Sequence, residues 1–217
     1  LISGEPGIGK SRLTVALQEK LHEQPYIPFL YFCSPHHRDS PLYPFIAQIE
    51  RAAGFVREDL PESKLDKLQV LLRQSGEHSA ESISAFADLL GVPTESRYPP
   101  GPSDPQRRRE LILRTLLDEL ESCSKQQPLL MIFEDAHWAD SSSLELLDRT
   151  AERLSRLSGL MVITHRPEFV PPWVGQAHVT SVILSRLANR DTTVLVTGIT
   201  GGKSLPAEIL DRLIERT

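Results

Sequence analysis

The most constraining feature of this sequence is the octapeptide GEPGIGKS at residues 4–11, which has the spacing G-x-x-x-x-G-K-[ST]. Glycines in such a stretch let the backbone curl until successive N–H groups point inward and form a site for an anion. A helical repeat of apolar residues follows and predicts a helix from Lys10 to about Leu21, whose positive amino-terminal end would face the same anion. The stretch therefore predicts a loop that surrounds the phosphates of a nucleotide.

A loop of this kind normally joins the end of a buried strand to the start of a helix. Only Leu1 and Ile2 remain of an apolar run before the loop, whereas strands usually have about 5–6 residues. We therefore expect a truncated first strand and a chain that is a segment of a longer protein. Its 217 residues are enough for one large domain, which we expect to span residues 1–217.

Composition and charge argue against several classes of protein. The chain has 40% hydrophobic and 24% charged residues, which is typical of a soluble globular domain. Its 24 Lys and Arg residues against 29 Asp and Glu residues argue against a general nucleic-acid surface. No apolar run approaches the roughly 20 residues of a membrane span, and no signal peptide is visible. Cys33 and Cys123 are too few for a disulfide framework, so we expect a reduced, cytoplasmic setting.

Hydrophobic patterning predicts an alternation of strands and helices, which is typical of a mostly parallel sheet with helices on both faces. We therefore predict an α/β fold whose ligands bind beyond the carboxyl ends of the strands. A helical insertion is expected at about residues 43–122, in three shorter pieces and one long helix. The strands that follow the first are expected at residues 27–33, 129–133, 160–164 and 178–184.

A further helix is expected between the strands at residues 129–133 and 160–164. Ser142 and Glu145 have the S-x-x-E spacing of a capping box, which predicts that the helix starts there. Gly159 is expected to end this helix, because glycine is the residue most common just past a helix end.

The third expected strand ends in two acids, Glu134 and Asp135. A triphosphate site needs one group that holds Mg²⁺ and another that orients the attacking water. Neighbouring residues on a strand point to opposite sides, so the two acids are not expected to have the same role. We assign Mg²⁺ to Glu134 and the Ser11 hydroxyl, and the water to Asp135. The alternative interpretation is a pair of solvated acids at a strand end.

A second stretch, TGITGGKS at residues 197–204, also ends in Gly-Lys-Ser. Thr197 occupies the position of the first glycine, and Pro206 would interrupt the helix that must begin at the lysine. We therefore interpret this stretch as a surface turn, followed by a helix at residues 207–216.

Two further groups of side chains are weaker candidates. Cys33, His36 and His37 could ligate zinc, but no second Cys/His pair has the required spacing. Residues 107–109 are three arginines in the first turn of the expected long helix, where the helix dipole disfavours cations. They could contact a phosphate, a partner or an acidic patch, although a solvated face is the favoured interpretation.

Four stretches together resemble one family: GEPGIGKSRL, CSPHHRDSPLYPFIAQIERAAGF, LLMIFEDAHWAD and LMVITHRPEF. They are similar to the STAND branch of the P-loop ATPases, which is related to AAA+ proteins. In particular, the chain resembles the ATPase modules next to class III adenylate/guanylate cyclase domains and those that precede LuxR-type DNA-binding domains. The resemblance implies a three-layer sandwich around a five-stranded sheet with the strand order 5-1-4-3-2.

The resemblance also implies roles for individual residues. Residues 4–11 would be the Walker A loop and residues 129–135 the Walker B strand. Thr164 and Arg166 match the sensor at the end of the fourth strand, where a guanidinium could contact the γ-phosphate. The signature residues without an assigned role are His137, Trp138 and Asp140. The residues expected to contact the nucleotide are Gly4, Glu5, Pro6, Gly7, Ile8, Gly9, Lys10, Ser11 and Arg12.

These features together predict a module that binds ATP with Mg²⁺ and hydrolyses it slowly, as a regulatory switch of a signalling protein. The expected partners are neighbouring domains of the same chain, namely a cyclase or DNA-binding output domain and a helical or repeat domain. Nucleotide-dependent self-association is a further option, and no direct contact with nucleic acid or membrane is expected. Two alternatives remain: a small-molecule kinase built on the same loop, which the arginines at 107–109 support, and a nucleotide-free scaffold.

Overall fold

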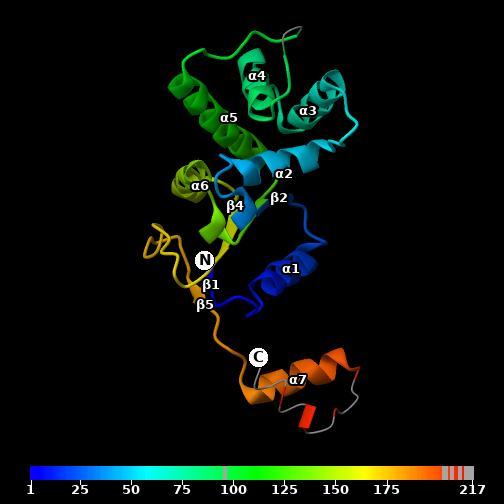
Figure 1. Ribbon diagram of the computed structural model, residues 1–217, viewed down its shortest axis with the longest axis vertical. Coiled ribbons are helices and arrows are strands. Elements are labelled where there is room, and N and C mark those ends of the chain that lie inside the picture. The colour runs from blue at the N-terminus through cyan, green and yellow to red at the C-terminus, as the bar shows by residue number, and fades with distance from the viewer. Residues whose placement is uncertain (95–96, 202–204, 206–207, 210–211, 213–217) are drawn as a thin grey trace.

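The computed structural model of the protein describes residues 1–94, 97–201, 205, 208, 209 and 212. Within these residues, five strands form one sheet in the order β2-β3-β4-β1-β5, and each neighbouring pair is parallel (Figure 1). Read from the other edge, this is the expected order 5-1-4-3-2, so the predicted α/β fold is confirmed. The strands are β1 (Ile2–Ser3), β2 (Ile27–Phe32), β3 (Leu129–Glu134), β4 (Gly159–His165) and β5 (Val182–Ile183).

Helices cover both faces of this sheet and fill the long connection between β2 and β3. The α-helices are α1 (Lys10–Leu21), α2 (Tyr43–Ala53), α3 (Pro61–Ser75), α4 (Ala80–Leu89), α5 (Pro105–Gln126), α6 (Ser141–Arg153) and α7 (Asn189–Ile199). The described residues also include the short 3-10 turns η1 (Pro35–His37), η2 (Ala136–Trp138) and η3 (Leu154–Arg156).

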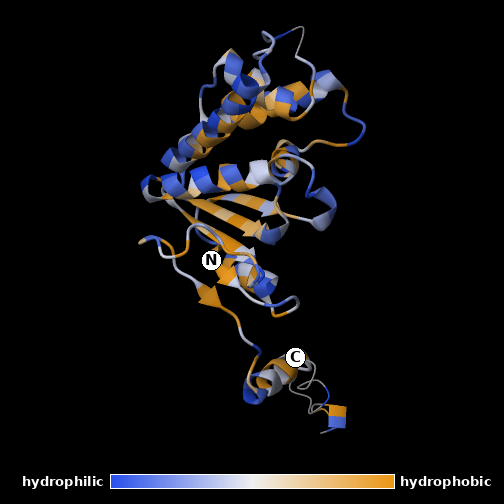
Figure 2. Cartoon of the chain, turned by 60° about the vertical axis from the view of Figure 1, so that its left-hand side comes forward, coloured by the Kyte–Doolittle hydropathy of each residue, from blue (hydrophilic) through white to orange (hydrophobic). Residues whose placement is uncertain are grey.

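Strand β3 shows why the fold has three layers. Its residues point alternately to the two faces of the sheet. Leu129, Met131 and Phe133 join the large core cluster that includes side chains of α2 to α6. Leu130 and Ile132 face the other way and pack with apolar side chains of α1. Both faces of β3 are thus covered, which accounts for its unbroken apolar run, and the strands stand out as hydrophobic in Figure 2.

The helical insertion lies beyond the β2 edge of the sheet and comprises α2 to α5 (Figure 1). Helix α5 continues to Gln126, past the expected end near Ser122. The reason is Cys123, which lies three residues after Leu120 on the same helix face and is also packed in the core cluster. The apolar face of α5 is therefore one turn longer than the leucine repeat alone indicates.

Gly159 was expected to end the helix before β4, and this expectation is wrong. Helix α6 ends at Arg153, and Gly159 is the first residue of β4, paired with Leu129 of β3. A Cβ atom at position 159 would lie 2.8 Å from the backbone oxygen of Leu129. Glycine is needed there because the two strand backbones approach closely, and not because a helix terminates.

The last part of the described chain adds the short edge strand β5 to the sheet and then leaves it. Strand β5 is limited to Val182–Ile183, within the expected range 178–184. Helix α7 lies apart from the sheet in both views (Figures 1 and 2). It includes Thr197–Ile199, so the expected surface turn begins only at Thr200. Most of the helix expected at 207–216 lies outside the described residues.

Among the described residues, no helix combines the length and the apolar character needed to cross a lipid bilayer.

Candidate functional site

The loop at residues 4–9 connects β1 to α1, as its motif requires. Gly7 and Gly9 have φ angles of +79° and +104°, a region that residues with a side chain rarely adopt. Gly4 is required for a different reason, because a Cβ atom there would lie 2.7 Å from Cγ2 of Ile8. Two glycines therefore allow the curl of the loop, and the third allows it to close on itself.

Lys10 places its charge inside this curl. The residue is 7% exposed, and its Nζ donates hydrogen bonds to the backbone oxygens of Gly4 at 2.8 Å and Glu5 at 2.9 Å. Its partners among the described residues are neutral carbonyl groups, so the buried ammonium remains attractive to an anion, since charge-assisted hydrogen bonds are the stronger ones. When phosphate binds, the Lys10 ammonium can therefore replace its hydrogen bonds to the loop carbonyl groups with hydrogen bonds to phosphate oxygens.

Glu134, at the end of β3, reaches the amino-terminal end of α1. The Ser11 hydroxyl donates a hydrogen bond to Oε2 of Glu134 at 2.8 Å, and the Thr14 hydroxyl lies 2.7 Å from Oε1. Both oxygens of the carboxylate are therefore held beside the loop. A hydroxyl and a carboxylate are oxygen ligands of the kind that Mg²⁺ prefers, so this donor set fits the expected ion.

Thr14 is the residue of this arrangement that the sequence reading missed. It is 1% exposed, and its hydroxyl lies 2.8 Å from the backbone oxygen of Ser11, so its single hydrogen can be donated either to this oxygen or to Glu134. Its signal in the sequence is the spacing of three residues from Ser11, which places both hydroxyls on one face of α1. That signal is weak, because threonine is common and its partner Glu134 is distant in sequence.

Asp135 lies in surroundings different from those of Glu134. Its backbone is left-handed, with φ 57° and ψ 47°, and its N–H donates a 2.9 Å hydrogen bond to Oγ1 of the buried Thr164 on β4. The turn directs the Asp135 side chain toward a cavity of about 290 Å³. The cavity is lined by Pro6, Gly7, Gly9, Lys10, Ser11, Arg12, Asp135 and Arg166.

Arg166 also lines this cavity, and residues that follow β3 lie beside its guanidinium. The Arg166 guanidinium lies 5.3 Å from the ring centroid of Trp138. His137 is 10% exposed at its side chain, and within the described residues neither of its ring nitrogens has a hydrogen-bond partner. Burial lowers the pKa of His137. The Asp135 carboxylate, 4.0 Å from Nδ1, opposes this effect, whereas the positive charges of Arg166 and Lys10 add to it. The imidazole therefore favours its neutral form next to the two cations of the site.

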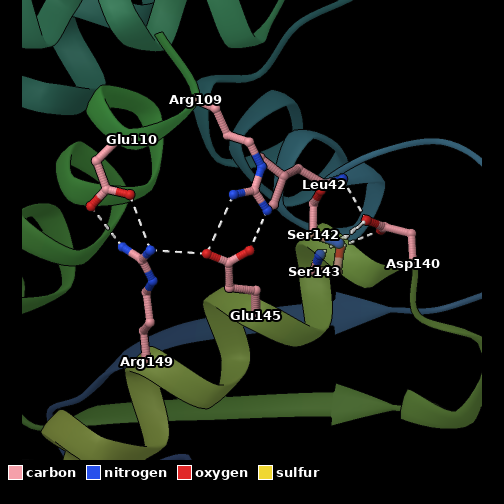
Figure 3. Close-up of polar contacts among 8 residues, drawn as sticks. All are labelled: Leu42, Arg109, Glu110, Asp140, Ser142, Ser143, Glu145 and Arg149. Carbon is pink, nitrogen blue, oxygen red and sulfur yellow. Dashed lines mark hydrogen bonds and ion pairs between the residues drawn. The ribbon is translucent and has the colours of Figure 1, made fainter. Parts of the chain in front are cut away.

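Asp140 has a structural role that the sequence left open (Figure 3). Its Oδ1 accepts hydrogen bonds from the backbone N–H groups of Ser142 and Ser143, both at 2.9 Å, and so caps the start of α6. The same oxygen accepts a 3.2 Å hydrogen bond from the N–H of Leu42, just before α2. Asp140 therefore joins the site loop to the helical insertion.

The predicted capping box at Ser142 and Glu145 is therefore wrong, although the helix does start close to Ser142. Helix α6 begins at Ser141 with Asp140 as its cap, which leaves Glu145 in the second turn, too far along to reach the cap. Glu145 instead forms ion pairs with Arg109 of α5 and Arg149 of α6 (Figure 3).

We predict that Asp140→Ala lowers the free energy of unfolding by about 2 kcal/mol. Roughly half would come from the lost cap and the rest from the buried N–H of Leu42, which would have no acceptor. The urea midpoint measures the change. The control is Ser79→Ala, which removes the cap of α4. The Ser79 hydroxyl accepts a hydrogen bond from the N–H of Ser82, so its loss should lower the free energy of unfolding by about 1 kcal/mol. Equal losses for the two variants would contradict a contribution from Leu42.

The arginines at 107–109 do not reach the loop cavity. Nε of Arg108 lies 3.2 Å from a carboxylate oxygen of Asp88, and Arg109 pairs with Glu145. None of the three lines the cavity that contains Lys10. Arg108 and Arg109 thus contact acidic side chains of the insertion and of α6, which was one of the alternatives to a solvated face.

The possible zinc ligands are not assembled either. Within the described part of the chain, no group of three or more His, Cys, Asp or Glu side chains is arranged to hold a metal ion. His37 stacks on Tyr43 with ring centroids 3.6 Å apart, and burial raises the pKa of Cys33 to about 12.

Comparison with known proteins agrees with the geometry of the site. Residues 1–163 match the family described as the AAA ATPase domain. The chain is also 28% identical over 197 residues to an uncharacterized protein of Rhizobium meliloti (strain 1021), an alignment that covers 90% of this chain and 19% of that protein. The chain thus spans about a fifth of the length of this relative. From the family match, the sheet order and the loop that connects β1 to α1, we conclude that the chain belongs to the AAA ATPase domain family of P-loop ATPases.

Proposed function

We propose that the protein binds ATP with Mg²⁺ at the loop of residues 4–11 and hydrolyses the nucleotide slowly. The observation that carries the proposal is the 2.8 Å hydrogen bond between Ser11 and Glu134, two residues that lie 123 positions apart in the sequence. It brings the end of a buried strand to the start of the helix that follows the loop. A hydroxyl, a carboxylate and an ammonium are then available at the edge of one cavity.

Each residue of the site has a chemical task in this proposal. The loop N–H groups and Lys10 would bind the phosphates, while Arg166 would neutralise charge at the outer phosphate. Ser11 and Glu134 would hold Mg²⁺, which supplies charge neutralisation between the phosphates when bound. Asp135 would orient the attacking water and accept its proton. The left-handed turn at Asp135 supports this division, since it separates the two neighbouring carboxylates.

We also propose that this activity serves as a regulatory switch and not as metabolic turnover. The support is the resemblance to STAND modules and the length of the Rhizobium relative, of which this chain matches 19%. In such a protein the nucleotide state would change contacts with neighbouring output or helical domains. Self-association that depends on nucleotide, and a cytoplasmic location, belong to the same proposal. A comparison of output activity with ATP and with ADP in the full-length protein tests it.

No observation favours the small-molecule kinase, because none of the arginines at 107–109 lines the cavity, and Arg108 and Arg109 form ion pairs away from it. Assays of phosphate transfer to acceptors and to water distinguish the two activities. Exclusive transfer to an acceptor would favour the kinase over the ATPase.

Binding itself leads to a prediction about stability. At a free MgATP concentration of about 100 times Kd, the free energy of unfolding should rise by about 2.7 kcal/mol, with a matching rise in Tm. Removal of Mg²⁺ with EDTA should reduce this rise, because Glu134 would then face the phosphates without a neutralising cation. An unchanged Tm at millimolar MgATP would instead support the nucleotide-free scaffold.

A further inference from the structure

The Trp138 ring lies against two guanidinium groups. The centroid of the ring is 5.3 Å from Arg166 and 5.8 Å from Arg38. Trp138 follows β3, Arg166 follows β4 and Arg38 follows β2, so the ring connects the carboxyl ends of three adjacent strands. Within the described residues, neither guanidinium has a carboxylate at ion-pair distance or a side-chain hydrogen bond. The aromatic ring is therefore their common contact in this part of the molecule.

The two arginines differ in their relation to the proposed nucleotide site. Arg166 lines the 290 Å³ cavity together with Lys10 and Asp135, whereas Arg38 is exposed and does not line it. An arginine side chain has about 2 kcal/mol of rotamer entropy, so an unpaired Arg166 would sample many positions. A cation–π contact of about 0.5–2 kcal/mol is enough to favour one of them.

Contacts with Asp135 and His137 restrict the position of the Trp138 ring. The backbone N–H of Trp138 donates a 2.9 Å hydrogen bond to the backbone oxygen of Asp135, which closes the η2 turn and fixes the main chain that carries the ring. The ring also packs against the buried imidazole of His137, with centroids 5.0 Å apart. Trp138 lies in the turn that Asp135 caps, and Asp135 and Arg166 both line the cavity, so the ring links the position of Arg166 to the turn that carries this acid.

We propose that Trp138 is a positioning residue that holds the Arg166 guanidinium at the outer-phosphate end of the site. The inference rests on the proposed ATP hydrolysis and adds a residue that acts through Arg166 without touching the nucleotide. Because ADP lacks the outer phosphate, loss of the ring should affect hydrolysis of ATP and leave ADP affinity unchanged.

The test uses Trp138→Ala, Trp138→Phe, Arg166→Ala and the double variant Trp138→Ala/Arg166→Ala. Single-turnover hydrolysis with Mg²⁺ should be about 5- to 10-fold slower in Trp138→Ala, as expected for a contact of this strength. Trp138→Phe keeps an aromatic face and should restore most of the rate. In the Arg166→Ala background, removal of the ring should have no further effect, because its target is gone.

A matched control lies elsewhere on the sheet. Phe32 is an exposed ring 5.2 Å from the guanidinium of Arg51 and does not line the loop cavity. Phe32→Ala removes a cation–π pair of the same kind and should leave hydrolysis unchanged.

The outcomes separate this inference from the function on which it rests. If the wild-type protein hydrolyses ATP and the ring deletion slows it equally with and without Arg166, then Trp138 acts through packing and the inference is wrong. A parallel loss of ADP affinity would have the same meaning, since it would show a disturbed loop. If the wild-type protein neither binds nor hydrolyses ATP, the proposed function fails, and the inference fails with it.

Discussion

Replacement of Lys10 by alanine should weaken the binding of ATP roughly 10²- to 10³-fold, as expected when a buried charged partner is removed from an ionic contact. The structure explains why this side chain cannot be replaced by a neighbour. Its ammonium is buried within the loop and held by two backbone carbonyl groups, at 2.8 and 2.9 Å. Arg12, the next cation of α1, pairs instead with Glu19 on the solvent side of the helix. Isothermal titration with ATP in the presence of Mg²⁺ measures the effect.

The control for Lys10 is Lys20, which lies on the same helix, is exposed and has the same charge. Lys20→Ala changes the net charge equally and should leave the affinity within about 2-fold, because exposed charges interact weakly in water. The urea midpoint of Lys10→Ala should be recorded beside its affinity, since Gly4 and Glu5 lose a donor. Undiminished ATP affinity in a folded Lys10→Ala protein would rule out this loop as the nucleotide site.

Asp135→Asn should slow hydrolysis about 10³-fold and leave ATP affinity nearly unchanged, because an amide cannot accept the proton of the attacking water. The substitution is conservative for the backbone. Asparagine tolerates the left-handed conformation at φ 57° as well as aspartate does, and the N–H that bonds Thr164 is retained. A change in the hydrolysis rate would therefore result from loss of the carboxylate and not from a distorted turn.

Variants of both acids test which of them binds Mg²⁺ and which orients the water. Glu134→Gln should weaken the dependence of binding on Mg²⁺, because Glu134 and Ser11 are the proposed ligands. Asp39→Asn removes an exposed acid from the loop after β2, outside the cavity lining, and should have no effect on rate. If Glu134→Gln stopped hydrolysis while Asp135→Asn altered the Mg²⁺ requirement, the two roles would have to be exchanged.

Several features of this protein follow from short stretches of sequence. The phosphate loop is one of them, since its curl depends on φ angles that glycine adopts at Gly7 and Gly9, and its helix begins at the next residue, Lys10. Strand β3 is another, because an unbroken apolar run indicates burial on both faces, and both faces are covered. The strand order was expected from the family resemblance and not from periodicity.

Local rules failed where a distant element supplied the deciding contact. Ser142 and Glu145 fit a capping box, yet Asp140 caps α6, and Glu145 is held by Arg109 of α5. Gly159 fits a helix end, yet the close backbone of β3 requires glycine at the start of β4. In each case the pattern was compatible with two structures, and packing selected one.

The sequence by itself thus determined the elements whose geometry depends on neighbours within about one helical turn or one strand. Only the tertiary structure decided which distant side chains meet: Glu134 with Ser11 and Thr14, Asp140 with Leu42, and Trp138 with Arg38 and Arg166. The physical reason is that backbone preferences and hydrophobic periodicity act locally along the chain. Contacts between strand ends depend on the order in which the strands pack, which no local period encodes.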